Sequence, residues 1–189
     1  MPTATNISQR TRRRCLDRLA GALLVALAVA VPSGAGAVTS AANAPPDLKC
    51  AWSIEPGARA GGPVRLRFSL SNPGRQAVKV LSWGTPFEGW LSPYLMLSRD
   101  GVALPYTGAS VKRGDPGREE YLRIAPGARR LVTIDLAEAF DLGAPGRYEL
   151  QPRILLHDVF AGTAIPPRPR ALHVPQPLDC PAGTFTLAG

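Results

Sequence analysis

The sequence is poor in the residues that most often carry chemistry. It contains two histidines, three cysteines and two methionines in 189 residues, and aromatic residues make up 6% of it. His157 and His173 lie sixteen positions apart, and neither belongs to an H-E-x-x-H motif, which places two zinc ligands on one helix face. We therefore expect both to be ordinary strand or loop residues, and we predict no metal and no cofactor.

Other catalytic patterns are also missing. No G-x-S-x-G segment occurs, so a serine hydrolase would lack its usual nucleophile position. Glu119 and Glu120 are adjacent, and neighbouring side chains of a strand point to opposite faces, so these carboxylates are not an acid–base pair. The sequence predicts no intrinsic catalysis. The alternative is a divergent hydrolase that uses His157 or Asp158.

No apolar run is long enough to span a bilayer comfortably. The run LAGALLVALAVAV at 19–31 falls short of the about 20 residues that a spanning helix needs. It follows arginines at 12–14 and precedes an Ala-Gly-Ala cleavage site at 35–37. We interpret residues 1–37 as a signal peptide, of the general or the twin-arginine type, with a retained N-terminal anchor as the alternative. Residues 38–47 read as a flexible mature N-terminus, and the predicted location is secreted or periplasmic.

The net charge is small once this leader is set aside. The whole chain has a formal net charge of +8, from 22 Lys and Arg against 14 Asp and Glu. Five of the arginines and one aspartate fall in the leader, which leaves 17 against 13, a net charge of +4. So mild an excess requires neither nucleic acid nor a membrane surface, and we predict neither as a partner.

The cysteines point to one disulfide. Cys15 lies in the leader, so Cys50 and Cys180 remain in the mature chain. Two cysteines in an exported protein most simply form a disulfide, and two free thiols are the alternative. Closing a loop of this length with a disulfide stabilises the folded state by about 4–5 kcal/mol in the chain-entropy model.

Proline and glycine, by contrast, are abundant and divide the chain into short strands. There are 20 prolines and 19 glycines. Residues 64–70 (VRLRFSL) alternate between apolar and polar side chains, as a strand with one wet face does, and an NPGR turn joins them to 77–83 in a predicted hairpin. Further strands are expected at 94–101, 102–106, 146–156 and 183–189, with two around Pro126-Gly127 in 118–136 and one helical turn at 137–141. This pattern predicts an all-β fold, an immunoglobulin-like antiparallel β-sandwich over 48–189.

One tyrosine sharpens that prediction. Gly146 and Tyr148 open a late strand directly after the helical turn, where immunoglobulin-like sandwiches place a tyrosine corner. The alternative is a plain buried strand tyrosine. Leu150 stands where antibody domains carry a cysteine, so the likeness is to the sandwich in general.

The segment LSWGTPFEGW at 81–90 concentrates two tryptophans and a phenylalanine. Trp83 continues a strand and is expected in the core. The residues after it either pack over the end of the sandwich or stay available as a contact surface. Those residues are Thr85, Pro86, Phe87 and Trp90.

Three segments resemble a known protease family. WGTPFEG at 83–89, YTGASVKR at 106–113 and DLAEAFDLGAPGRY at 135–148 resemble, in this order, segments of the non-catalytic N-terminal domain of deuterolysin-like peptidyl-Lys metalloendopeptidases. In that family a zinc catalytic domain follows, whereas this sequence ends at Gly189 and has no position that matches the family's catalytic residues. The resemblance implies a domain like a protease pro-domain, without catalytic activity.

The resemblance also implies a partner. A pro-domain recognises a protease, so we expect a secreted metalloprotease or another protease to bind, with inhibition or folding assistance as the outcome. Tyr106, Lys112 and Arg113 would form a polar, cationic rim beside the aromatic segment, as interfaces commonly do. The competing interpretation is a structural or carbohydrate-binding sandwich of the cell envelope.

Overall fold

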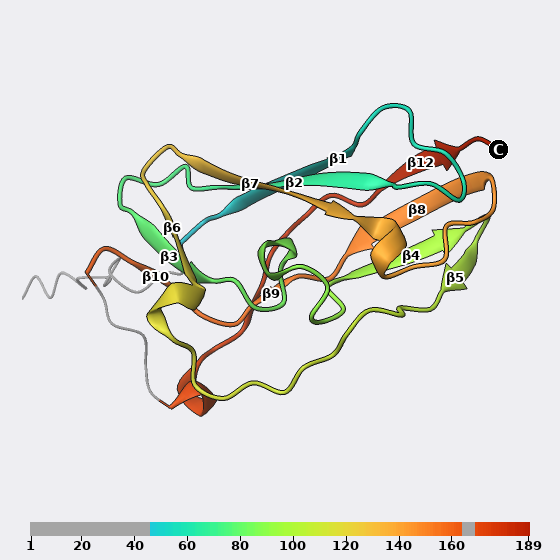
Figure 1. Ribbon diagram of the computed structural model, residues 1–189. Coiled ribbons are helices and arrows are strands. Elements are labelled where there is room, and N and C mark those ends of the chain that lie inside the picture. Colours follow the sequence, from blue (N-terminus) through green and yellow to red (C-terminus); the bar gives the residue numbers. More distant parts are fainter. Residues whose placement is uncertain (1–45, 164–168) are drawn as a thin grey trace, which may run out of the picture. The chain divides into compact units, whose positions relative to one another are not determined.

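The described part of the chain is built almost entirely from strands. In the computed structural model, residues 46–163 and 169–189 are described (Figure 1). The predicted signal peptide and residues 38–45 lie outside them. The strands are β1 (Lys49–Ile54), β2 (Arg65–Ser71), β3 (Val78–Leu81), β4 (Leu95–Arg99), β5 (Val102–Leu104), β6 (Tyr121–Ile124), β7 (Arg129–Asp135), β8 (Gly146–Pro152), β9 (Leu155–Leu156), β10 (Val159–Ala161), β11 (Gln176–Pro177) and β12 (Gly183–Leu187).

All pairings between these strands are antiparallel. They form the sheets β1–β2–β7, β10–β3–β6, β11–β9 and β12–β8–β4–β5. Single 3₁₀ turns connect some of the strands: η2 (Pro86–Glu88), η3 (Arg118–Glu120), η4 (Leu136–Glu138) and η5 (Arg170–Leu172). The predicted all-β class is confirmed, and η4 provides the helical turn expected near 137–141.

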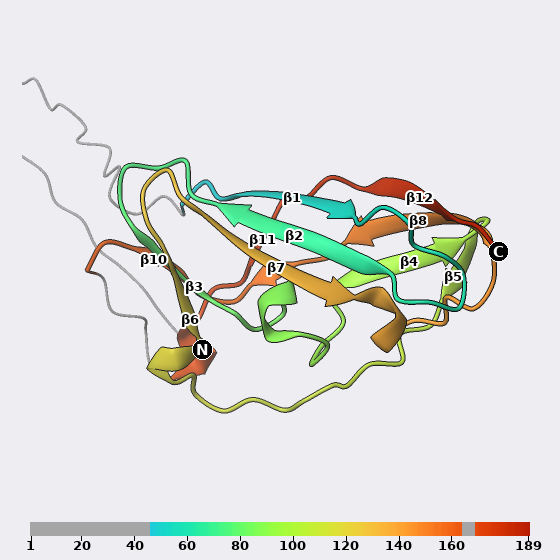
Figure 2. The ribbon, with the colours of Figure 1, turned by 45° about the horizontal axis from the view of Figure 1, so that its top comes forward.

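The hydrophobic core lies between β1–β2–β7 and β12–β8–β4–β5, which Figure 2 shows from a second side. Every second residue of 64–70 is buried, as the alternation predicts. Leu66 and Phe68 of β2 line one small internal space together with Leu95 of β4 and Leu150 of β8. Apolar side chains from both sheets therefore fill the interior, and burying them supplies the main driving force for folding.

A corner at Asn72 corrects the predicted hairpin of residues 64–83. β2 and β3 form, but they belong to different sheets. The buried side chain of Asn72 fixes the corner, since its Nδ2 donates to the Gln76 carbonyl across the turn. It also donates to the carbonyls of Ile124 and Ala125 at the end of β6. β6 and β7 pass the same corner, so β2 pairs with β7 and β3 with β6. The NPGR motif marks a turn, but long-range hydrogen bonds decide which sheet the chain enters.

Two further residues hold the start of β8. The buried Tyr148 hydroxyl donates to the Ala144 carbonyl, four residues upstream, over 2.6 Å. Gly146 has φ 155°, and a Cβ on it would lie 2.7 Å from Oδ2 of Asp100. A side chain there would meet the Asp100 carboxylate and the Arg99 side chain at the turn between β4 and β5, so this close approach favours glycine.

A disulfide joins the two ends of the described chain. Cys50 of β1 is bonded to Cys180, which precedes β12, with 5.4 Å between the Cα atoms. This confirms the predicted pairing. Among the described residues no helix has the length and apolarity to cross a membrane.

Candidate functional site

The aromatic segment at 81–90 packs inward. Thr85, Pro86 and Trp90 are buried, and Phe87 is half-buried with its ring edge on Phe68, 5.6 Å between centroids. Thr85 caps η2, because its Oγ1 accepts the Phe87 N–H and donates to the Ser82 carbonyl. The interpretation of this loop as a contact surface is therefore wrong for Thr85, Pro86 and Trp90. These side chains are buried in the fold, so a partner cannot reach them.

Trp90 sits in an aromatic cluster. Its ring stacks on Tyr94 at 4.9 Å between centroids and meets the edge of Phe140 at 5.8 Å. Tyr106 joins the cluster from the other side, and its hydroxyl donates to the Ala109 carbonyl. The Trp90 Nε1 donates to a backbone carbonyl over 2.7 Å. Tyr106, predicted as part of a rim, thus serves mainly as packing.

Trp83 is buried as well, but charged side chains surround it. Its Nε1 donates to Oε1 of Glu120 over 2.7 Å. The guanidinium of Arg113 lies 5.0 Å from the centre of its ring, and that of Arg170 lies 5.5 Å from it. Arginine over an indole face is a favourable cation–π arrangement, so the ring holds both guanidinium groups in place.

Glu88 anchors Arg113 in this arrangement. The Nη2 of Arg113 lies 2.6 Å from Oε2 of Glu88, and the Glu88 side chain is 6% exposed. Oε1 of Glu88 accepts the Gly84 N–H and the Ser92 hydroxyl. These donors orient the carboxylate, which in turn fixes the guanidinium opposite. Arg113 is thus well positioned, whereas Lys112, predicted with it as part of the rim, is exposed to solvent.

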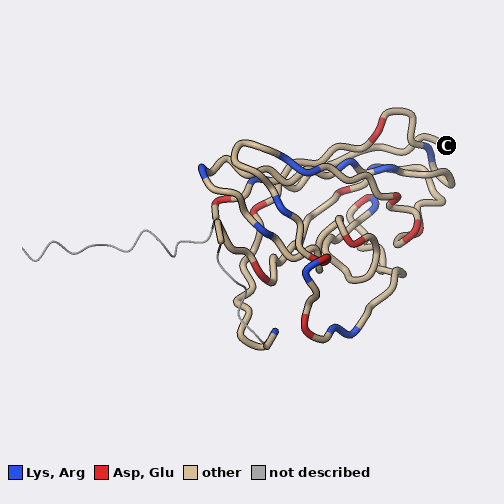
Figure 3. Tube along the Cα trace, turned by 60° about the vertical axis from the view of Figure 1, so that its left-hand side comes forward, with Lys and Arg blue, Asp and Glu red and all other residues tan. Residues whose placement is uncertain are grey.

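A pocket opens beside these residues. Its volume is about 620 Å³, and it brings together segments that are far apart in the sequence. We call it the basic pocket, lined by Arg113, Gly114, Asp115, His157, Arg170, Ala171, His173 and Pro175. Two arginines and two histidines against one aspartate make its lining predominantly basic. By contrast, Lys and Arg and Asp and Glu are both scattered over the described trace as a whole (Figure 3).

Asp158 lies behind the basic pocket and is itself buried. Its Oδ2 accepts the Tyr121 hydroxyl over 2.7 Å and lies 3.8 Å from Nε2 of His173. Burial lowers the pKa of His157, and the nearby Arg170 cation lowers it further. The alternative hydrolase would use His157 and Asp158. These side chains have different surroundings, since His157 lines the basic pocket and Asp158 bonds a tyrosine hydroxyl.

Exposed aliphatic side chains flank the basic pocket along the chain. Val111 precedes Arg113 by two residues and Leu155 precedes His157 by two. Leu172 and Val174 border His173 directly, and Val174 is 81% exposed. Large apolar side chains this open to solvent suit packing against another protein.

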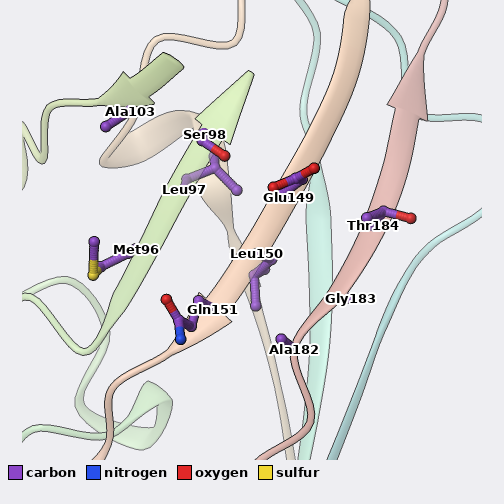
Figure 4. A pocket seen from close by; sticks show the side chains of 10 residues that line it. All are labelled: Met96, Leu97, Ser98, Ala103, Glu149, Leu150, Gln151, Ala182, Gly183 and Thr184. Atoms are coloured by element: carbon purple, nitrogen blue, oxygen red, sulfur yellow. The ribbon is translucent and has the colours of Figure 1, made fainter. Parts of the chain in front are cut away.

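A second hollow lies on the outer face of β12–β8–β4 (Figure 4). Its volume is about 390 Å³, and its labelled side chains include Met96, Glu149, Gln151 and Thr184. These side chains lie on the solvent-facing side of the strands. Within residues 46–163 and 169–189, no group of three or more His, Cys, Asp or Glu side chains is arranged to hold a metal ion.

The sequence predicts a role for Arg113 but not for its neighbours in the pocket. It predicts His157 and His173 as ordinary strand or loop residues, and no pattern in it singles out Arg170. They converge because η5 and β9 fold back beside the 106–117 segment, and Arg170 Nη1 donates to the Arg113 carbonyl over 3.0 Å. No local sequence motif predicts such a convergence.

Part of the chain is similar to known proteases. It is 30% identical over 88 residues to an extracellular protease of Aeromonas hydrophila. It is 25% identical over 91 residues to a neutral protease 2 homolog of Coccidioides posadasii, and 26% identical over 91 residues to one of Uncinocarpus reesii. No protein-family model matches the chain.

The extent of these matches limits what they establish. Each covers 47% of this chain and 25–26% of the relative, so the chain spans about a quarter of the length of the curated relatives it matches. The matches therefore relate a region of this chain to proteases.

Proposed function

We propose that this chain is a non-catalytic, extracytoplasmic domain that binds a protease, as an inhibitor or a folding assistant. Its fold in this proposal is an immunoglobulin-like sandwich, supported by the two facing antiparallel sheets and by the Tyr148 hydroxyl bonded to upstream backbone. The partial similarity to proteases supports the choice of partner.

The extracytoplasmic location has three supports. The basic and apolar segments at 10–31 have the order of a signal peptide. The Cys50–Cys180 disulfide suits an oxidising compartment. One of the similar proteins is named an extracellular protease.

The observation that carries the proposal is the surface around the basic pocket. Arg113 and Arg170 lie over the Trp83 ring, and Leu172 and Val174 stand exposed on the adjoining turn. Oriented arginines at the centre and apolar side chains beside them are typical of a protein–protein interface. Because the exposed apolar side chains are aliphatic, this surface suits a protein better than the stacked sugar rings of a carbohydrate ligand.

The absence of catalysis is part of the proposal and has its own test. The purified protein, with zinc added, is incubated with labelled casein. We expect no hydrolysis that a chelator abolishes. Hydrolysis that disappears in His157→Ala would establish the divergent hydrolase instead.

The binding itself is tested by capture of proteolytic activity. The protein is immobilised, exposed to the secreted proteins of the producing organism and washed, and the retained fraction is released from it before the assay on labelled casein, so that inhibition does not hide a bound protease. We expect the wild type to retain activity and Leu172→Asp/Val174→Asp to lose it about thirtyfold, as when a contact worth about 2 kcal/mol is removed. Leu131→Asp, an equally open leucine on β7, is the matched control. Equal retention by the double variant and the wild type would place the contact elsewhere.

A further inference from the structure

We infer that the basic pocket binds a carboxylate group of the protein partner, with Arg170 as the residue that receives it. This inference rests on the proposed function and names the chemistry of the group recognised. It covers two sources of the same chemistry: the C-terminal carboxylate of a peptide chain and the side chain of an aspartate or glutamate.

Arg170 differs from Arg113 in its charge balance. Arg113 has a carboxylate partner, since Glu88 lies 2.6 Å away. In the part of the chain that the structure describes, no carboxylate lies within ion-pair distance of the Arg170 guanidinium, and its hydrogen bond goes to the Arg113 carbonyl. Asp115 bonds the backbone N–H of Arg170, not its side chain. The pocket thus contains a cation that the described chain does not neutralise.

The Arg170 guanidinium is also held in position. Nη1 is fixed by the Arg113 carbonyl at 3.0 Å, and the group lies over the Trp83 ring at 5.5 Å. A guanidinium held by one nitrogen still has donors on its other edge, and that fork matches the two oxygens of a carboxylate. Because the group is ordered before binding, little side-chain entropy is lost when the anion arrives.

The rest of the pocket favours the same ligand. Burial and the Arg170 cation lower the pKa of His157, which shows that the pocket already disfavours another positive charge. An incoming carboxylate would relieve that effect and offer the His157 ring an acceptor. A volume of about 620 Å³ admits a side chain or a chain end with its neighbouring residues.

The test uses three N-acetylated alanine–glycine peptides of equal length. The first ends in a free carboxylate. The second is amidated and carries one internal glutamate, and the third is amidated with glutamine in that place. Binding to the exported protein is followed by NMR, through the ring signals and pKa values of the two histidines.

We expect saturable shifts of the His157 signal, and a raised His157 pKa, with the first or the second peptide and neither effect with the third. The first two peptides separate a chain end from a side chain. Arg170→Gln should weaken binding at least about tenfold, as expected when a charged hydrogen bond is lost. It should also raise the His157 pKa of the free protein, because the cation is gone, and circular dichroism checks that the variant is folded. Arg123→Gln, on the exposed face of β6, is the matched control and should leave both unchanged.

Three results would overturn the inference: binding of the glutamine peptide as tight as that of the carboxylates, no saturable shift with any peptide, or unchanged affinity in a folded Arg170→Gln variant. The capture of proteolytic activity separates this failure from that of the proposed function. Retained activity that depends on Leu172 and Val174, without carboxylate binding, leaves the protease-binding role standing and removes the carboxylate site alone.

Discussion

Trp83 and Trp90 lie seven residues apart and are almost equally buried, at 5% and 8% exposed, yet their surroundings have little in common. Trp90 contacts aromatic rings, and its N–H donates to a backbone carbonyl. Trp83 donates to a carboxylate and lies beneath two guanidinium groups. The Trp90 region resembles any protein core, whereas the Trp83 region holds opposite charges beside an open pocket.

The difference shows that burial does not by itself separate a core from a binding surface. Removing charges from water is costly, and apolar packing around Trp83 would stabilise the fold at least as well. The charged groups around Trp83 are therefore weak evidence for a stabilising role, and they fit the proposed role in recognition. Substitutions around Trp90 should accordingly affect mainly stability, whereas substitutions around Trp83 should also affect peptide binding.

Trp90→Ala should have the largest effect on stability. It empties the centre of the aromatic cluster, and truncations of this kind cost about 3–5 kcal/mol. Chemical denaturation followed by circular dichroism measures the loss. A cost below about 1 kcal/mol would mean that the cluster does not hold this part of the core.

Glu88→Gln should lower the stability of the fold but strengthen the binding of the carboxylate peptides. The amide has one acceptor oxygen in place of two, so it loses either the hydrogen bond from Arg113 or those from Gly84 and Ser92, and the free energy of unfolding falls by about 1.5–3 kcal/mol. The pocket also becomes more positive, so the carboxylate peptides should bind several-fold more tightly. Weaker peptide binding by the folded variant would show that Glu88 positions the site more than it neutralises it.

Trp83→Phe should cost about 1 kcal/mol, since the hydrogen bond to Glu120 is lost while most of the apolar ring remains. The smaller ring supports Arg170 less well, so carboxylate binding should weaken. Trp90→Phe provides the comparison, because it should leave peptide affinity unchanged. The distinction between the two regions fails if both variants weaken peptide binding equally.

The smallest expected effect is a pH dependence that comes from His157. Its pKa is lowered in the folded state, so its contribution to stability is complete above the unfolded value of about 6.5 and is lost as the pH falls below that value toward the folded pKa. The stability of His157→Gln should therefore fall less than that of the wild type as the pH is lowered below about 6.5. Denaturation midpoints measured over this range provide the check, and an unchanged slope would contradict the assignment.

The parts of the fold that local patterns determine were predictable. The alternation at 64–70 places the right side chains inside, and the expected disulfide between Cys50 and Cys180 is present. The sheet-switching corner at Asn72 was not predictable, because two of its amide hydrogen bonds reach the carbonyls of Ile124 and Ala125, more than 50 residues away at the end of β6.

The candidate site was predictable only at Arg113. An aromatic loop has the same composition whether it packs or stays exposed, so the sequence could not decide that Trp90 faces the core. The basic pocket draws on the segments around 113, 157 and 170, and electrostatic convergence of this kind leaves no periodicity to detect.

Amide hydrogen exchange in the presence of the captured protease tests the central claim most directly. The basic pocket and the hollow on the outer face of β12–β8–β4 should give opposite results, since only the former adjoins Trp83. We expect binding to slow exchange in residues 110–115 and 170–175 and to leave 96–103 and 149–151 unchanged. Slower exchange confined to the outer face, with 110–115 and 170–175 unaffected, would contradict the assignment of the basic pocket as the binding surface.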